Sequence, residues 1–326
     1  MKKTLLSGGR PTGKLHLGHY LGAFKNFSKL QRDYNSYLVL SDIHFLTTKN
    51  SKIEIATIEI NSINMVIDCI AMGIDIDSTT FYLQSSIPEL THIFIIFQNY
   101  INYTRALQTP SLLEMKKHSK SDDVSLGLLS YPVMEAGDIF ALNADIVPVG
   151  RDNIDHLAIA QEIIKKINFE FDVKYTIPSC LTDEKTNYLV GIDGSEKMSK
   201  SLDNAIYIRD DEYAIKSKVN NMIWHSECFE KNVVAQYLKV FDGEYGEQDK
   251  LKSDILCGYI DEKKAKNLLI DVLMDLLMPM QERIKPYIKN KKEIYELLFN
   301  GSKKARNIVC QQLESLKSDM GLFQFN

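Results

Sequence analysis

The first two hundred residues alternate between short apolar runs and longer stretches with helical spacing. The apolar runs predict four strands, at residues 4–6, 37–40, 81–83 and 146–149. Apolar residues that recur every three or four positions predict helices, at residues 17–34, 51–72 and 154–167. Ser51 and Glu54 have the spacing of a capping box at a helix start, and Gly73 follows the last turn of that helix.

Strands separated by helices predict an α/β fold with a doubly wound parallel sheet, because right-handed crossovers join parallel neighbours. Ligands of such sheets bind beyond the carboxyl ends of the strands, where the strand order reverses. We therefore expect the chemistry in the loops after the first, second and fourth strands, at residues 8–19, 42–44 and 150–152.

The strand-like runs stop near residue 205. Beyond it the apolar spacing predicts helices punctuated by Pro279 and Pro286, at residues 212–224, 232–241, 262–278 and 291–317. A chain of 326 residues has room for two domains of roughly 150 residues each. We divide it into an α/β domain, residues 1–205, and an all-helical domain, residues 206–326.

The composition is that of a globular protein, with 44% hydrophobic and 25% charged residues, which excludes a disordered or low-complexity chain. The net charge of −4 gives no general attraction to nucleic acid, so such a partner must meet a local patch. No apolar stretch approaches the roughly 18 residues of a membrane span, and no signal peptide is recognisable. We expect a soluble, cytoplasmic protein. Its five scattered cysteines form no Cys-x-x-Cys pair, which favours reduced thiols.

A first candidate motif lies at residues 11–20, Pro-Thr-Gly-Lys-Leu-His-Leu-Gly-His-Tyr. A glycine-containing turn that runs into a helix presents backbone N–H groups and a positive helix end to an anion. His16 and His19 can donate hydrogen bonds to phosphate oxygens, and Gly18 leaves room for a flat ring against the backbone. Taken alone, the two histidines also fit a metal pair or an inert surface turn.

A second candidate motif is Lys-Met-Ser-Lys-Ser at residues 197–201. Lys197 and Lys200 suit the negative charge that builds on a pyrophosphate leaving group. Alone, this run would be read as a solvated lysine loop.

The two motifs together resemble the His-x-Gly-His and Lys-Met-Ser-Lys-Ser motifs of class I aminoacyl-tRNA synthetases. Residues 145–152, Asp-Ile-Val-Pro-Val-Gly-Arg-Asp, and 131–139, Tyr-Pro-Val-Met-Glu-Ala-Gly-Asp-Ile, are similar to segments of tryptophanyl-tRNA synthetases. The resemblance extends from Leu5 to about Leu202, with a weaker likeness at residues 301–306. It implies a Rossmann-like catalytic domain that joins tryptophan and ATP into an adenylate and then charges tRNA(Trp).

The resemblance implies roles for residues of both motifs. It assigns catalysis to the motif imidazoles and ammonium groups of His16, His19, Lys197 and Lys200. It assigns further ATP contacts to Gly8, Arg10, Thr12, Gly18, Gly150, Asp152, Met198 and Ser199. Mg²⁺ is expected on the ATP phosphates, without metal ligands from protein side chains. A lysine between residues 108 and 120 should also touch ATP, with Lys116 and Lys117 as candidates.

The same resemblance implies a tryptophan site, in which Asp138 accepts the indole N–H, a group that can only donate. The other residues that it places around the substrate are Leu6, His44, Tyr131, Glu135, Val147, Val149 and Asn153. Two of these depart from the family pattern. Glu135 replaces a Met or Gln and suits the substrate's α-ammonium group, and Asn153 stands where Gln is usual.

The implied partners are L-tryptophan, ATP and tRNA(Trp), in a symmetric homodimer without membrane contact. The resemblance implies that the helical domain contacts the anticodon and that its last helix packs back on the catalytic domain. It also places an insertion, about residues 100–140, near the dimer interface. Cys257 is isolated, so we expect no cysteine-bound iron–sulfur cluster, which some relatives carry.

Three alternatives stay open. Tyrosyl-tRNA synthetases share the fold, both motifs and an Asp at position 138, but the Val-Pro-Val-Gly strand at 147–150 and Leu6 favour tryptophan. A nucleotidylyltransferase keeps His-x-Gly-His, yet the helical tail and the lysine motif speak against it. A non-enzymatic RNA-binding relative would have degraded ATP motifs, and here they are intact.

Overall fold

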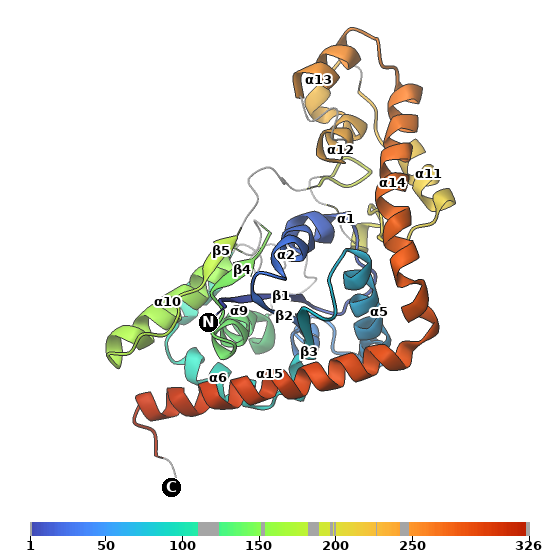
Figure 1. The fold of residues 1–326 in the computed structure, drawn as a ribbon. Helices are drawn as coiled ribbons and strands as arrows, with labels where there is room; N and C mark the ends of the chain where they lie inside the picture. Colours follow the sequence, from blue (N-terminus) through green and yellow to red (C-terminus); the bar gives the residue numbers. More distant parts are fainter. Residues whose placement is uncertain are drawn as a thin grey trace.

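A computed structural model of the chain describes residues 2–109, 124–150, 154–181, 189–195, 198, 200–225, 227–241 and 248–323. Its centre is a parallel sheet with strand order β3-β2-β1-β4-β5 (Figure 1). The strands are β1 (Thr4–Gly9), β2 (Asn35–Leu40), β3 (Thr79–Leu83), β4 (Ile146–Pro148) and β5 (Ser179–Leu181). The expected parallel sheet is confirmed, and its order reverses between β1 and β4. The sequence pattern did not predict β5, because its residues are largely exposed.

Helices cover both faces of the sheet. Successive residues of a strand point to opposite faces, and in β2 both sets are buried. Leu38 and Leu40 join one apolar cluster, and Tyr37 and Val39 join the other. The first cluster includes residues of α2 (Lys25–Leu30) and α5 (Ile58–Ala71). The second includes residues of α6 (Glu89–Gln98), α9 (Leu126–Ala141) and α10 (Ile154–Glu170).

Two expected helices are divided in the structure. The stretch 17–34 forms α1 (Leu17–His19), a π-helical turn η1 (Tyr20–Phe24) and α2, which ends before residue 31. The stretch 51–72 starts with the expected capping box at α4 (Lys52–Ile55), but the Thr57 hydroxyl donates to the Glu54 carbonyl and α5 begins afterwards. Gly73 ends that helix with a φ of +96°.

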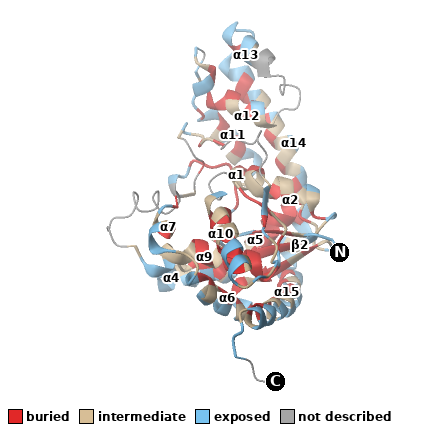
Figure 2. Ribbon diagram, turned by 90° about the vertical axis from the view of Figure 1, so that its left-hand side faces the viewer, coloured by how far each residue is buried: buried red, intermediate tan, exposed pale blue. Residues whose placement is uncertain are grey.

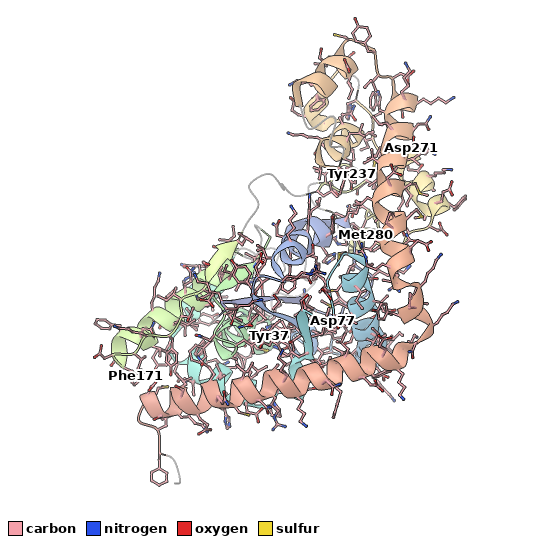
Figure 3. The ribbon with its side chains drawn as sticks, viewed as in Figure 1. Tyr37, Asp77, Phe171, Tyr237, Asp271 and Met280 are labelled. Atoms are coloured by element: carbon pink, nitrogen blue, oxygen red, sulfur yellow. The ribbon has the colours of Figure 1, made fainter. Side chains whose placement is uncertain are left out.

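The other elements are α3 (Asp42–Phe45), η2 (Gln84–Ser86), α7 (Tyr103–Leu107), η4 (Lys200–Leu202), α11 (Glu212–Asn220), η5 (Phe229–Lys231), α12 (Val233–Phe241), α13 (Gln248–Leu256), α14 (Glu262–Lys289) and α15 (Lys291–Asp319). The apolar pattern did not predict α13, because its sequence is mostly polar. Apolar residues of α11, α12 and α14 share the cluster of the first sheet face. Figure 2 shows buried residues in these helices, and Figure 3 labels two members of the cluster, Tyr237 of α12 and Met280 of α14. The core thus continues across residue 205, where the domain boundary stays a prediction.

The expectation that Pro279 and Pro286 end helices was wrong, because α14 continues through both. A proline removes one backbone N–H and leaves the carbonyl four residues earlier without its helical partner. Both prolines are exposed, as are Asp275 and Glu282, whose carbonyls lose that bond. Water can therefore satisfy these groups while Leu277, Met280 and Ile284 continue the buried face of the helix.

The last helix, α15, packs against the edge strand β3 (Figure 1). A Cβ atom at Gly301 would lie 1.9 Å from the carbonyl oxygen of Phe81, so the helix approaches this closely only with glycine there. The next residue, Ser302, accepts a hydrogen bond at Oγ from the backbone N–H of Leu83 at 3.0 Å. The helix therefore covers a strand edge that would otherwise expose backbone groups. In the described residues, no helix is long and apolar enough to cross a membrane.

We predict that Gly301→Ala lowers the free energy of unfolding by about 2–3 kcal/mol, because the added methyl group forces α15 away from β3. Urea unfolding followed by circular dichroism measures this. Gly22→Ala is the matched control, since a Cβ at Gly22 meets no atom within 4 Å. Equal stability of the two variants would contradict the close packing.

Candidate active site

The loop after β1 brings the first motif to the carboxyl edge of the sheet. The backbone N–H of His16 donates to Nδ1 of His19 at 3.2 Å, and the two ring centroids lie 3.8 Å apart. Asp68 of α5 holds this loop in place: its Oδ2 accepts a hydrogen bond from the backbone N–H of Leu15 at 3.0 Å. Its other oxygen, Oδ1, lies 2.6 Å from Nε of Arg209. Burial raises the pKa of Asp68, although Arg209 and the Leu15 bond oppose the shift.

The second motif meets the first in space. Lys200 donates from Nζ to the Thr12 hydroxyl at 3.2 Å and to the Gly13 carbonyl at 3.1 Å, across 188 residues of sequence for the former contact. Gly18 and Met198 also face each other, since a Cβ at Gly18 would lie 3.9 Å from that of Met198. Residues of both motifs are thus brought together at one place, as a shared nucleotide site requires.

The ammonium group of Lys200 is held in an unfavourable environment. Burial lowers its pKa to about 8, and the charges of Arg10 and Lys49 add to this effect, while Asp68 opposes it. Cations gathered around a buried ammonium disfavour its charged form, and an anion placed among them would restore it. This arrangement suits the binding of a polyphosphate.

Asp138 of α9 is buried, with 4% of its surface exposed. Its Oδ2 accepts a hydrogen bond from Gln84 Nε2 at 2.7 Å, and His44 Nδ1 lies 3.8 Å from the same oxygen. The other oxygen, Oδ1, is buried and has no hydrogen-bond partner among the described residues. Burial raises the pKa of Asp138 to about 6, with His44 and Gln84 opposing the rise.

Two further polar residues of α9, Tyr131 and Glu135, form a second group with His156 of α10. His156 of α10 is buried and joins two of the expected substrate residues: Nε2 lies 2.8 Å from the Tyr131 hydroxyl, and Nδ1 lies 2.9 Å from Glu135 Oε2. Burial alone would raise the pKa of Glu135, but the His156 bond and the charges of His156, His44 and Arg10 outweigh it, so this pKa is lowered. His44 Nε2 lies 3.3 Å from the Tyr131 carbonyl oxygen, which links the two groups.

The apolar residues expected around the substrate share one buried cluster. Leu6 comes from β1, and Val147 and Val149 come from β4 and the residue after it. These strands are neighbours at the reversal of strand order, where α/β sheets bind ligands. Gly8 lies in β1, where a Cβ would overlap Val39 of β2, and Gly150 follows the end of β4.

Several expected site residues lie outside the described part of the chain: Lys116, Lys117, Asp152, Asn153, Lys197 and Ser199. Sequence reasoning missed three buried residues that organise the site, Asp68, Gln84 and His156. Gln84 directly follows the third predicted strand, and that position was a signal we could have used. Asp68 and His156 lie inside helices, and only the fold reveals their partners.

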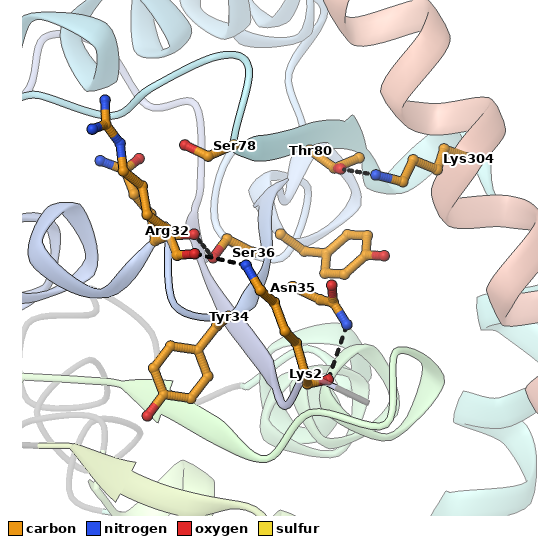
Figure 4. Close-up of a pocket in the computed structure, with 10 residues that line it drawn as sticks. Lys2, Arg32, Tyr34, Asn35, Ser36, Ser78, Thr80 and Lys304 are labelled. Atoms are coloured by element: carbon orange, nitrogen blue, oxygen red, sulfur yellow. Dashed lines mark hydrogen bonds between the residues drawn. The ribbon is translucent and has the colours of Figure 1, made fainter.

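Two cavities lie away from these residues. One is a polar cleft of about 200 Å³ at the amino ends of β2 and β3, with Lys2, Arg32 and Lys304 on its walls (Figure 4). The other, about 740 Å³, is a largely apolar groove between α5 and α15. Asp42, from the predicted loop at residues 42–44, lines the groove, but none of the residues assigned to ATP or tryptophan lines either cavity. Within the described ranges, no group of three or more His, Cys, Asp and Glu side chains is placed to hold a metal ion.

A sequence model for the tRNA synthetases class I (W and Y) matches residues 2–281. The chain belongs to this family. It is 37% identical over 332 residues to the tryptophan–tRNA ligase of Borreliella burgdorferi, covering 98% of this chain and 94% of that protein.

Solved structures of both branches of the family resemble this synthetase. The tryptophanyl-tRNA synthetase of Campylobacter jejuni, complexed with ADP and tryptophan, is 27% identical, with a TM-score of 0.82 and coverage of 98% of this chain and 100% of that one. The tyrosyl-tRNA synthetase of Archaeoglobus fulgidus, complexed with L-tyrosine, is 25% identical, with a TM-score of 0.70 and coverage of 87% and 90%. The class I fold expected from the sequence is confirmed.

We predict that this synthetase takes up a proton when ATP binds at pH 8.5. Lys200 is largely neutral there, because its pKa is about 8, and the phosphates would raise that pKa. Calorimetric titrations in buffers of different ionisation enthalpy measure the uptake. Lys200→Arg keeps its charge at this pH and should abolish the uptake, and an unaltered protein that binds ATP without gaining protons would refute the prediction.

Proposed function

We propose that this chain is a tryptophan–tRNA ligase that joins L-tryptophan and ATP into tryptophanyl-adenylate and then transfers tryptophan to the 3′ end of tRNA(Trp). The sequence likeness to tryptophan–tRNA ligases over nearly the whole chain supports this activity. The observation that carries the choice of amino acid is the buried Oδ1 of Asp138, which lacks a donor among the described residues.

A buried carboxylate oxygen without a hydrogen bond is costly, so a substrate that supplies one donor there gains affinity. The indole N–H is such a donor and has no acceptor to satisfy. Leu6, Val147 and Val149 are apolar neighbours suited to the rest of the ring. The free Asp138 oxygen and these apolar side chains together match a bicyclic apolar group with a single N–H.

At the other end of the amino acid, we assign the α-ammonium group to Glu135. Its lowered pKa keeps it ionised at neutral pH, as binding a cation requires. His156 fixes one carboxylate oxygen and the Tyr131 hydroxyl, so it orients both residues without needing to touch the substrate.

In the first step, a carboxylate oxygen of tryptophan forms a bond to the α-phosphorus of ATP. The bond between that phosphorus and the bridging oxygen breaks, and pyrophosphate leaves with the electron pair. No enzyme nucleophile is needed, so catalysis rests on positioning and on stabilising phosphate charge. His16, His19, Lys197 and Lys200 are proposed for that stabilisation. Mg²⁺ carried by the phosphates would supply further positive charge.

For the second step, we propose that residues 206–326 hold the anticodon of tRNA(Trp) and that the protein works as a homodimer. The helices α12 and α13 and the start of α14 lie away from the sheet (Figure 1), which gives reach beyond the catalytic centre. Phosphate contacts by their lysines would make tRNA affinity fall with added salt.

The deciding experiment is amino-acid-dependent exchange of radiolabelled pyrophosphate into ATP. We expect exchange with tryptophan and at most a trace with tyrosine, followed by charging of tRNA(Trp) when tRNA is supplied. Exchange supported by tyrosine alone would make the protein the tyrosine enzyme of its family. Exchange with neither amino acid would overturn the proposed function.

We also predict that tryptophan binding weakens at acid pH. Asp138 must be ionised to accept the indole N–H strongly, and its pKa in the free protein is about 6. The affinity is therefore complete from about pH 7 upward and is lost as pH falls through 6, with KM for tryptophan rising about tenfold for each pH unit below that. Exchange kinetics between pH 5 and 8 measure this, and a flat profile would exclude Asp138 as the acceptor.

Glu135→Ala should raise KM for tryptophan about ten- to a hundredfold, because a charged hydrogen bond to the ammonium group is lost. KM for ATP is the internal control and should stay unchanged. A tryptophan KM equal to that of the unaltered protein would remove Glu135 from the substrate site.

A further inference from the structure

The side-chain amide of Gln84 is fixed on both sides by groups of known polarity. The backbone N–H of His44 donates to its Oε1 at 3.2 Å, and that group can only donate. Asp138 Oδ2 lies 2.7 Å from its Nε2 and, as a carboxylate oxygen, can only accept. The two contacts together define which end of the amide is oxygen. Gln84 is also 3% exposed, so water does not compete for it.

The second hydrogen on Gln84 Nε2 points to the ring of His44. The ring Nε2 faces the carbonyl oxygen of Tyr131, an acceptor, so the neutral ring carries its proton on Nε2. Nδ1 is then an acceptor. Both ends of the Gln84 amide lie near it, Nε2 at 2.8 Å and Oε1 at 3.0 Å, and only Nε2 can donate to it. Both N–H bonds of the Gln84 amide are therefore committed, one to His44 and one to Asp138.

This commitment makes the two oxygens of Asp138 unequal. Oδ2 is held by Gln84, and Oδ1 has no partner in the described part of the chain. We propose that Gln84 is a positioning residue for tryptophan recognition: it fixes the rotation of the Asp138 carboxylate so that a single oxygen remains to accept the indole N–H. The assignment rests on the proposed function and extends it to a residue that does not contact the substrate.

The place of Gln84 in the fold supports this role. It directly follows Leu83, the last residue of β3, whose backbone N–H is bound by Ser302 of α15. Ser85, on its other side, donates from its backbone N–H and its hydroxyl to the two oxygens of Asp42. Gln84 is thus anchored through both of its neighbours in the sequence. A residue that orients another side chain must itself be held in place in this way.

The test combines Gln84→Met, which keeps the length of the side chain but cannot donate, with a substrate analogue. The analogue is β-(3-benzothienyl)alanine, in which sulfur replaces the indole N–H. We expect Gln84→Met to raise KM for tryptophan about ten- to a hundredfold, the loss of one hydrogen bond to a charged group. KM for the analogue should change less than about twofold, since it has no N–H to accept.

Gln31→Met is the matched control, because Gln31 is similarly buried and its side-chain amide forms four hydrogen bonds, none of them to a residue that contacts Asp138. It should leave the preference for tryptophan over the analogue unchanged. An equal rise of KM for tryptophan and for the analogue in Gln84→Met would assign Gln84 a purely structural role and overturn the inference. Absence of exchange in the unaltered protein would instead overturn the proposed function.

A second variant keeps the proposal testable if Gln84→Met is unstable. In Gln84→Glu, the protonated carboxyl group can still donate to Asp138 Oδ2, but two ionised carboxylates repel. Other charged or titratable groups also face Asp138: His44 and Asp42 of α3, Glu135 of α9 and the Tyr82 hydroxyl of β3. Relative to the unaltered protein at the same pH, kcat/KM for tryptophan should fall at least about tenfold between pH 6 and 8. A constant ratio across this range would contradict the assigned hydrogen bond.

Discussion

The candidate site depends on keeping charged groups away from water at the carboxyl edge of a parallel sheet. Three charged groups are largely buried: Asp68, Asp138 and Lys200. Burial raises the pKa of the two carboxyl groups and lowers that of the ammonium group, which in each case favours the neutral form. The fold tolerates these shifts because each group is held by specific partners from other elements. Asp138 keeps one oxygen without a hydrogen bond from the described residues, and Lys200 lies among other cations. An indole N–H suits the first and a polyphosphate suits the second.

The arrangement also explains why two short motifs far apart in sequence belong to one site. The reversal of strand order between β1 and β4 opens the sheet where the first loop leaves it. The contacts of Lys200 with Thr12 and Gly13 then bring the second motif onto that loop. The nucleotide end and the amino-acid end of the site are connected through Arg10, whose charge acts on both Lys200 and Glu135.

Apolar periodicity was sufficient for the central strands, because strands buried on both faces have continuous apolar runs. It also predicted most of the long helices, but not α6 or α9. It failed where packing overrides local pattern: α14 continues through Pro279 because its exposed side can be solvated, and β5 is too polar to detect. The motifs identified His16, His19 and Asp138 as candidates. The position of Gln84 directly after a predicted strand was a usable signal. No spacing rule could identify His156, since it lies inside a helix and its partners lie in another element.

The contact between α15 and β3 links the end of the chain to its first half. β3 pairs with β2 on one side. On its other side Ser302 holds Leu83 and Gly301 lies against Phe81, so the open edge of the strand that precedes Gln84 is covered by a late segment. During translation, the whole sheet therefore leaves the ribosome before the helix that seals its edge. A nascent chain that ends ahead of residue 301 has every strand but lacks this clamp, and its edge strand is open to pairing with other chains.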